Sequence, residues 1–144
     1  MIRVYVNQFC SEIGCSPETI YNENTRTWYF VRGTASVEVF MSSYETNVKT
    51  IRTFMRVFAP VVAIPTDTIK RMELFAELLK LNCSYMGVKL ATIPEKGFVY
   101  AVAERDIDGM DYTEFKTTIG DLGSWADQLD DLLQARYGTP ASLN

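Results

Sequence analysis

Apolar residues recur along this chain with two different periods, which divide it into helices and strands. Residues 3–13 place Val6, Phe9 and Ile13 at helical spacing, and Gly14 follows where a helix end favours positive φ. Residues 28–41 instead form two runs that are dense in aromatic and β-branched side chains, separated by Gly33 and Thr34. The pattern predicts a first helix and then two antiparallel strands.

Residues 50–64 fit both periods. Ile51, Phe54 and Phe58 match one face of a helix, but strict alternation also separates the odd from the even positions. Pro60 and Pro65 would each interrupt a helix and favour extended backbone before them. We therefore predict a third strand, in which Pro60 indicates a sheet edge or a bulge.

A second helix is predicted from Asp67, whose side chain can accept the unpaired amides of the first turn. The helix carries a continuous apolar stripe that Phe75 and Leu78 widen. The stripe consists of Ile69, Met72, Ala76, Leu79 and Cys83. We expect this helix to be central, with a broad buried face.

Two more strands, at residues 88–93 and 98–103, flank a loop that ends in Gly97. Asp111 and Glu114 then have the spacing of a capping box, which predicts the start of the last helix. Its apolar positions are Phe115, Ile119, Leu122, Ala126, Leu129 and Leu133. Gly120 and Gly123 inside it indicate a bend or the close approach of another backbone.

The chain has 144 residues, which suits one domain; we assign that domain to residues 1–138 and expect residues 139–144 to fray. The first residues lack the unbroken apolar core of a signal peptide. No stretch approaches the ~18 apolar residues that a membrane helix needs. Three cysteines at unrelated spacings do not form a disulfide framework. These observations predict a cytoplasmic protein with reduced thiols and no membrane partner.

The charged and reactive residues exclude several functions. The formal net charge is -4 and no long basic cluster occurs, which argues against DNA or RNA as a partner. The chain has no histidine, no glycine-rich phosphate loop and no CxxC pair, so no metal, cofactor or catalytic group is predicted. Asp106, Asp108 and Asp111 lack the glycine and glutamate spacing of a calcium loop. We expect a non-enzyme.

The succession of elements resembles the YbjN family, which is grouped with the small chaperones of type III secretion. Residues 57–65 look like the family's third strand leading into the second helix, and residues 77–82 resemble its helix-ending Leu-Asn element. Residues 109–115 look like the start of its last helix, and residues 133–138 are similar to its closing segment. The resemblance covers residues 5–138. It implies an α+β fold of the type III secretion chaperone-like kind, in the order α-β-β-β-α-β-β-α, with an antiparallel sheet packed against helices.

The resemblance also implies a homodimer that offers its surfaces to a protein or peptide client, without catalysis. The local candidate for partner binding is Arg52, Phe54, Arg56 and Phe58, which share one face of the predicted third strand. Two plainer interpretations stay open. The rings can pack under a helix while the arginine stems reach solvent, or the basic strand can pair with the acidic last helix, within one chain or across a dimer. A regulatory or structural homodimer without a peptide groove is the alternative function, and a small-molecule enzyme is the least favoured.

Overall fold

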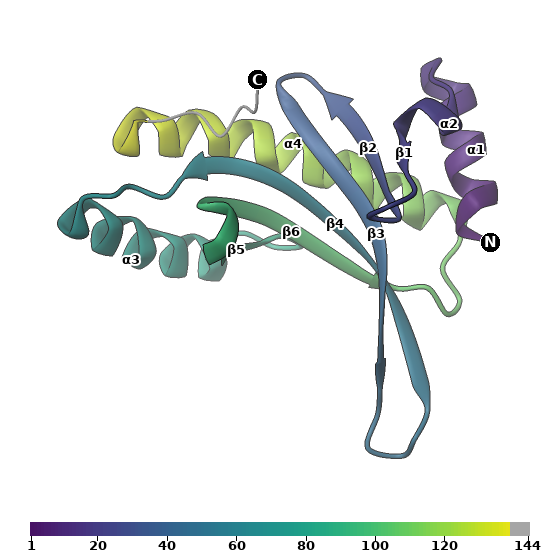
Figure 1. The fold of residues 1–144 in the computed structure, drawn as a ribbon. Coiled ribbons are helices and arrows are strands. Elements are labelled where there is room, and N and C mark those ends of the chain that lie inside the picture. The colour runs from purple at the N-terminus through teal and green to yellow at the C-terminus, as the bar shows by residue number, and fades with distance from the viewer. Residues whose placement is uncertain (139–144) are drawn as a thin grey trace.

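The computed structural model describes residues 1–138 as one six-stranded antiparallel sheet with helices packed against it (Figure 1). The helices are α1 (Ile2–Ile13), α2 (Pro17–Ile20), α3 (Thr68–Ser84) and α4 (Tyr112–Tyr137), with a 3₁₀ turn η1 (Pro94–Lys96). The strands are β1 (Tyr21–Asn22), β2 (Thr27–Arg32), β3 (Ala35–Glu45), β4 (Ile51–Ala63), β5 (Lys89–Ile93) and β6 (Phe98–Asp106). The sheet order is β1-β2-β3-β4-β6-β5.

The predicted α+β order is confirmed, and the sheet gains one strand that the pattern did not indicate. The short elements α2 and β1 lie between the first helix and β2. Gly14 ends α1 with φ 77°, as expected of a residue that must adopt left-handed backbone. The assignment of one domain to residues 1–138 stays a prediction, and the frayed tail at 139–144 lies outside the described residues.

Residues 51–63 form strand β4, as predicted. β4 pairs with β3 on one side and β6 on the other, so the edge alternative for Pro60 is wrong. The bulge alternative is right, because the β4–β6 register shifts between Pro60 and Val62. The shift accommodates the missing N–H of proline inside the sheet.

Helix α4 lies across one face of the sheet and contacts β3, β4 and β6. Its six predicted apolar positions are all buried. The capping box at its start is present, with Glu114 N–H donating to Asp111 (2.8 Å) and Asp111 N–H donating to Glu114 (3.1 Å). The core therefore sits between α4 and the inward side chains of the strands.

Helix α3 begins after its Asp67 cap, as predicted, but both its position and its buried face differ from the prediction. It runs beside the edge strand β5 rather than across the centre of the sheet (Figure 1). Its buried side chains are Leu74, Leu78 and Leu81. The predicted stripe faces outward: Ile69, Met72 and Leu79 are 68%, 67% and 73% exposed, and Cys83 is exposed as well. Within residues 1–138, no helix is both long and apolar enough to cross a membrane.

Candidate functional site

The four predicted partner-binding residues lie on the face of the sheet opposite α4, which we call the outer face. Alternation along β4 turns Met55 and Val57 toward the core and turns Phe54, Arg56 and Phe58 the other way. A separate apolar cluster forms on the outer face, and all its members come from strands. They are Phe58, Tyr100 and Val102, with Phe40, Ala91, Ile93 and Phe98 packed around them. The interpretation that the rings pack under a helix is therefore wrong for the described residues.

The aromatic rings on the outer face pack against one another. Phe58 packs against Phe40 and Tyr100, with ring centroids 5.1 and 6.0 Å apart, and is only 7% exposed. Tyr44 stacks on Phe54 at 5.8 Å with an interplanar angle of 25°. Such contacts add to the stability that ring burial already provides. The outer face is thus a preformed aromatic surface.

The two arginines lie over these rings. The Arg56 guanidinium carbon is 4.8 Å from the Phe58 centroid and 5.7 Å from that of Phe40. Arg52 lies 5.3 Å from the centroid of Phe54. This arrangement combines planar hydrogen-bond donors with apolar contact area, which suits recognition of a polypeptide.

Within the chain, the acids that pair with the arginines come from β6 and not from the last helix, so the alternative of a pairing with α4 of the same chain is wrong for these residues. Arg52 donates to Asp106, and Arg56 donates to Glu104 at 3.1 Å. Lys89 also donates to Glu104, at 2.9 Å. The hydrogen bond from Arg52 lowers the pKa of Asp106, and the hydrogen bond from Lys89 is the main cause of the lowered pKa of Glu104.

A shallow depression of about 360 Å³ opens on the outer face beside these pairs. Its lining residues are Ser42, Ser43, Tyr44, Phe54, Arg56 and Glu104. Two of the four predicted residues, Phe54 and Arg56, line it directly. Arg52 lies opposite Tyr44 in the next cross-strand pair, and Phe58 lies opposite Glu38, among the rings. The surface thus unites all four predicted residues, with Phe58 as its buried floor.

The sequence prediction missed the residues that β3 and β6 contribute to this surface. Phe40 and Tyr44 alternate with inward residues along β3 in the same way as Phe54 and Phe58 along β4. That alternation was readable from the chain, but the register between the two strands was not. The register places Phe40 opposite Arg56 and Ser42 opposite Phe54.

Glu38 is a carboxylate half-buried among the rings of the outer face. It lies opposite Tyr29 on β2 and opposite Phe58 on β4. Burial raises its pKa, and the nearby charge of Lys96 partly opposes that shift. The ionised Glu38 carboxylate therefore destabilises the folded protein, and protonation at low pH removes this cost.

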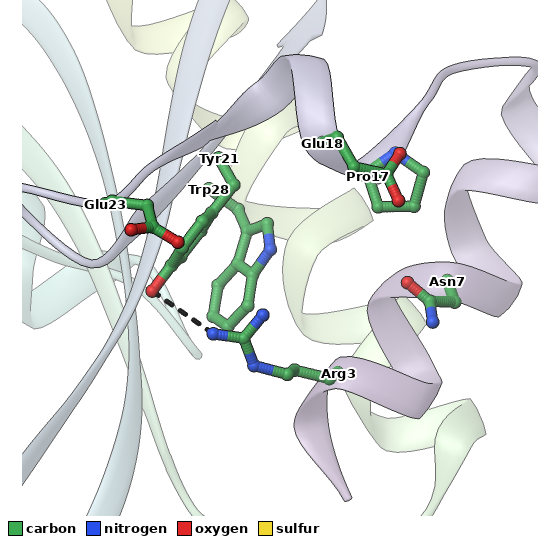
Figure 2. A pocket seen from close by; sticks show the side chains of 7 residues that line it. All are labelled: Arg3, Asn7, Pro17, Glu18, Tyr21, Glu23 and Trp28. Atoms are coloured by element: carbon green, nitrogen blue, oxygen red, sulfur yellow. Dashed lines mark hydrogen bonds between the residues drawn. The ribbon is translucent and has the colours of Figure 1, made fainter.

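A second hollow, of about 300 Å³, lies between α1 and β1 (Figure 2). Arg3 extends across it and places its guanidinium carbon 5.0 Å from the Tyr21 ring and 5.8 Å from the Trp28 ring. Arg3 also donates to the Tyr21 hydroxyl at 3.5 Å, the dashed line in Figure 2. Since the chain's own arginine fills the aromatic end of this hollow, we interpret the contact as one that holds α1 against the sheet.

Comparison with known proteins shows which fold the chain has, but it identifies no family to which the chain belongs. No protein-family model matches the sequence. No curated protein matches it either. Among solved structures, a chain of the ExsC-ExsE complex has a TM-score of 0.65 and 14% identity, covering 99% of this chain and 96% of that chain.

Two further solved structures share the fold. A chain of the HopA1-SchA chaperone-effector complex has a TM-score of 0.60 and 12% identity, covering 90% of this chain and 93% of its own. YbjN from E. coli has a TM-score of 0.57 and 13% identity, covering 90% of this chain and 89% of its own. The fold that the resemblance implied is therefore confirmed as the one shared by YbjN and by chains of the ExsC-ExsE and HopA1-SchA complexes.

Proposed function

We propose that this protein binds an extended segment of a partner protein on the outer face of its sheet, and that it does so without catalysis. The observation that carries the proposal is the aromatic and guanidinium surface around Phe54 and Arg56, which no helix of residues 1–138 covers. The fold is shared with a chain of a chaperone-effector complex, which supports the same role. Added strands and alternate side-chain contacts are how sheets hold extended segments.

A protein partner fits this surface better than a nucleic acid. Arg52 and Arg56 are already paired with Asp106 and Glu104, so they offer little free positive charge to phosphates. The stacked rings offer apolar contact that a polypeptide can cover. The cytoplasm is the proposed location, because Cys10, Cys15 and Cys83 are all free thiols and suit a reducing compartment.

The test uses a displayed library of random twelve-residue peptides selected against the full chain. Selected peptides are then measured against Arg52→Ala and Phe54→Ala, with the fold of each variant checked by circular dichroism. We expect each variant to weaken binding at least tenfold. The matched control is Ile51→Ala, which truncates an exposed residue of the same strand and should leave binding unchanged. Unchanged affinity in both site variants with an intact fold removes this surface from the proposal.

We also propose that the protein forms a homodimer through α3. Ile69, Met72 and Leu79 form an outward apolar stripe, and Phe75 beside them is 39% exposed. Stripes of this kind on a soluble protein mark association surfaces. A twofold pairing of identical helices would cover the stripe of each copy with that of the other.

The homodimer is tested by Leu79→Glu, with Lys80→Glu as the matched control on the neighbouring position. Sedimentation equilibrium should show a dimer for the parent and the control and a monomer for Leu79→Glu. A parent that sediments as a monomer contradicts this part. The alternative function, a regulatory or structural homodimer without a peptide groove, is also favoured by the stripe. This alternative predicts that the protein is a dimer and that no peptide of the library binds to it.

A further inference from the structure

The sheet has three places where a strand could be added, and they are not equally open. At one end, β5 is capped at Leu90 by the side chain of Asn82 on α3, which donates to the Leu90 carbonyl (3.1 Å) and accepts the Leu90 N–H (2.6 Å). At the other end, β1 covers β2 only as far as Trp28, and α2 packs beside β2. The third place is internal to the sheet order and lies on β3.

Strands β3 and β4 extend together beyond their neighbours and form an arm, which we define as residues 41–53. The pairing of β2 with β3 ends at Trp28 and Val39, whereas the pairing of β3 with β4 continues to Glu45 and Ile51. Figure 1 shows the resulting two-stranded arm projecting well away from the helices. The outer half of β3 therefore has a strand on one side only, among the described residues.

The hydrogen-bond pattern shows which backbone groups of the arm lack a partner. Thr46 N–H donates to Thr50 carbonyl at 2.8 Å, so Thr46 and Thr50 form a hydrogen-bonded pair across the hairpin. In an antiparallel ladder such pairs alternate, so Tyr44 and Ser42 also bond to β4. The donor and acceptor groups of Met41, Ser43 and Glu45 then point to the opposite side. The Ile107 N–H that donates to Thr53 carbonyl on the far side of β4 agrees with this alternation.

This edge lacks the features that usually prevent pairing with another chain. Residues 41–45 contain no proline and no lysine, and the β3–β4 register is continuous through them. Ser42, Ser43 and Tyr44 also line the depression on the outer face. A strand added here would place alternate side chains beside Ser42 and Tyr44, at the β3 margin of that depression.

From these observations we infer that the client segment adds as a strand along the β3 edge of the arm, at Met41 to Glu45. The inference rests on the proposed function and names where it takes place. The segment should carry apolar residues at alternate positions, because those side chains would pack against Tyr44 at the β3 margin of the depression. Its flanks need no particular net charge, because Arg52 and Arg56 at the base of the arm are already paired with Asp106 and Glu104.

A second copy of this chain fits the edge less well than a client. Antiparallel self-pairing centred on Ser43 would set the Glu45 carboxylate of one copy beside Met41 of the other, with no cation opposite. The α3 stripe, moreover, offers a second copy a larger apolar surface. We therefore assign the arm edge to a different polypeptide.

The test places proline at single edge positions of the full chain and uses the displayed twelve-residue library as the probe. Ser43→Pro removes an outward N–H without removing a bond to β4 and should weaken the selected peptides at least tenfold. Ser43→Ala controls for loss of the hydroxyl contact with Thr53 (2.7 Å) and should bind as the parent does. Val31→Pro blocks the free part of the β2 edge instead and should also bind as the parent does.

The outcomes separate this inference from the proposed function. Peptides weakened by Val31→Pro but not by Ser43→Pro would overturn the β3 location and keep the proposed function. A library that yields no binder to the parent overturns both. A parent dimer that Ser43→Pro dissociates would show that the edge holds a second copy, which also overturns the inference. Enriched peptides that alternate apolar residues and depend on Ser43 would support it.

Discussion

The side chain of Asn82 on α3 pairs with both backbone groups of Leu90 on β5, in the way that a neighbouring strand would. Its amide oxygen accepts the Leu90 N–H at 2.6 Å, and its amide nitrogen donates to the Leu90 carbonyl at 3.1 Å. The contact joins the end of α3 to the edge of the sheet. It also gives a physical role to the asparagine of the helix-ending Leu-Asn element.

Asn82→Ala should destabilise the fold by about 1 kcal/mol, because it leaves the Leu90 donor and acceptor without their partners. Urea unfolding followed by circular dichroism measures the change. Ser84→Ala, on the same helix end, removes a hydroxyl contact with the Lys80 carbonyl and should stay within about 0.5 kcal/mol of the parent. Amide hydrogen exchange at Leu90 should accelerate only in Asn82→Ala. Equal exchange in both variants would show that Asn82 does not close this edge.

The two glycines inside α4, Gly120 and Gly123, lie close to the side chain of Arg32. A Cβ built on Gly123 would lie 2.6 Å from Arg32 Cδ, whereas one built on Gly120 would lie 3.4 Å from the mobile Arg32 Nη1. The close approach predicted at this point is therefore made by a side chain rather than by a backbone. Arg32 ends β2, so its stem fills the space that the missing Cβ leaves on α4.

Gly120→Ala should stabilise the protein by up to about 1 kcal/mol through helix propensity. Gly123→Ala should lose that gain or reverse it, because the added methyl group displaces the Arg32 stem. In an Arg32→Ala background, Gly123→Ala should recover most of its lost gain, although the remaining Cβ of residue 32 would still lie 3.3 Å from the added methyl group. Chemical unfolding of the parent and the five variants gives the free energies of unfolding that this comparison needs. A Gly123→Ala protein as stable as Gly120→Ala in the parent background would contradict the packing argument.

Much of the fold could be predicted because each element carries its own local signal. The Asp111 cap, the Pro60 bulge and the six buried positions of α4 all follow from residues close in sequence. The buried face of α3 could not be predicted in this way. The apolar residues of α3 extend around much of its circumference, so periodicity alone could not decide between the stripe through Leu79 and the one through Leu78.

The candidate site likewise combines features that the local sequence predicts with features that it does not predict. Alternation along β4 correctly placed Arg52, Phe54, Arg56 and Phe58 on one face. What covers that face, and which acids pair with the arginines, depends on strand order. Because β6 rather than β5 lies beside β4, Asp106 and Glu104 come opposite Phe54 and Arg56. Contacts between residues so far apart in sequence have no local signature.

Arg3 should contribute modestly to the attachment of α1. Removing its guanidinium in Arg3→Met keeps the apolar stem but loses the contacts with Tyr21 and Trp28, at a cost of about 0.5–1 kcal/mol. Lys70→Ala, an exposed cation on α3, should change stability by less. Trp28 fluorescence, recorded in a Trp125→Phe background, should change for Arg3→Met. An unaltered spectrum together with unaltered stability would contradict the role given to Arg3.

Glu38 and Glu104 should show opposite pH dependence, although both are outer-face glutamates. Burial raises the pKa of Glu38, so the folded state binds this proton more tightly than the unfolded state does. Its ionised form therefore destabilises the protein above the raised folded pKa, and that cost disappears below the unfolded value of about 4.3. Lys89 and Arg56 lower the pKa of Glu104, so its stabilising effect is present above that unfolded value and is lost as the pH falls through the folded pKa.

Glu38→Gln should consequently be more stable than the parent at pH 7 and equal to it at about pH 4 and below. Glu104→Gln should be less stable than the parent at pH 7, with a deficit that shrinks on acidification. Urea midpoints of the three proteins from pH 3 to pH 8 provide the measurement, and acids common to all three cancel in the differences. Lys96→Met should enlarge the gain from Glu38→Gln, because the Lys96 charge is what partly offsets the burial of this carboxylate. A Glu38→Gln protein less stable than the parent at pH 7 would mean that the carboxylate is held by a partner and is not a source of strain on the outer face.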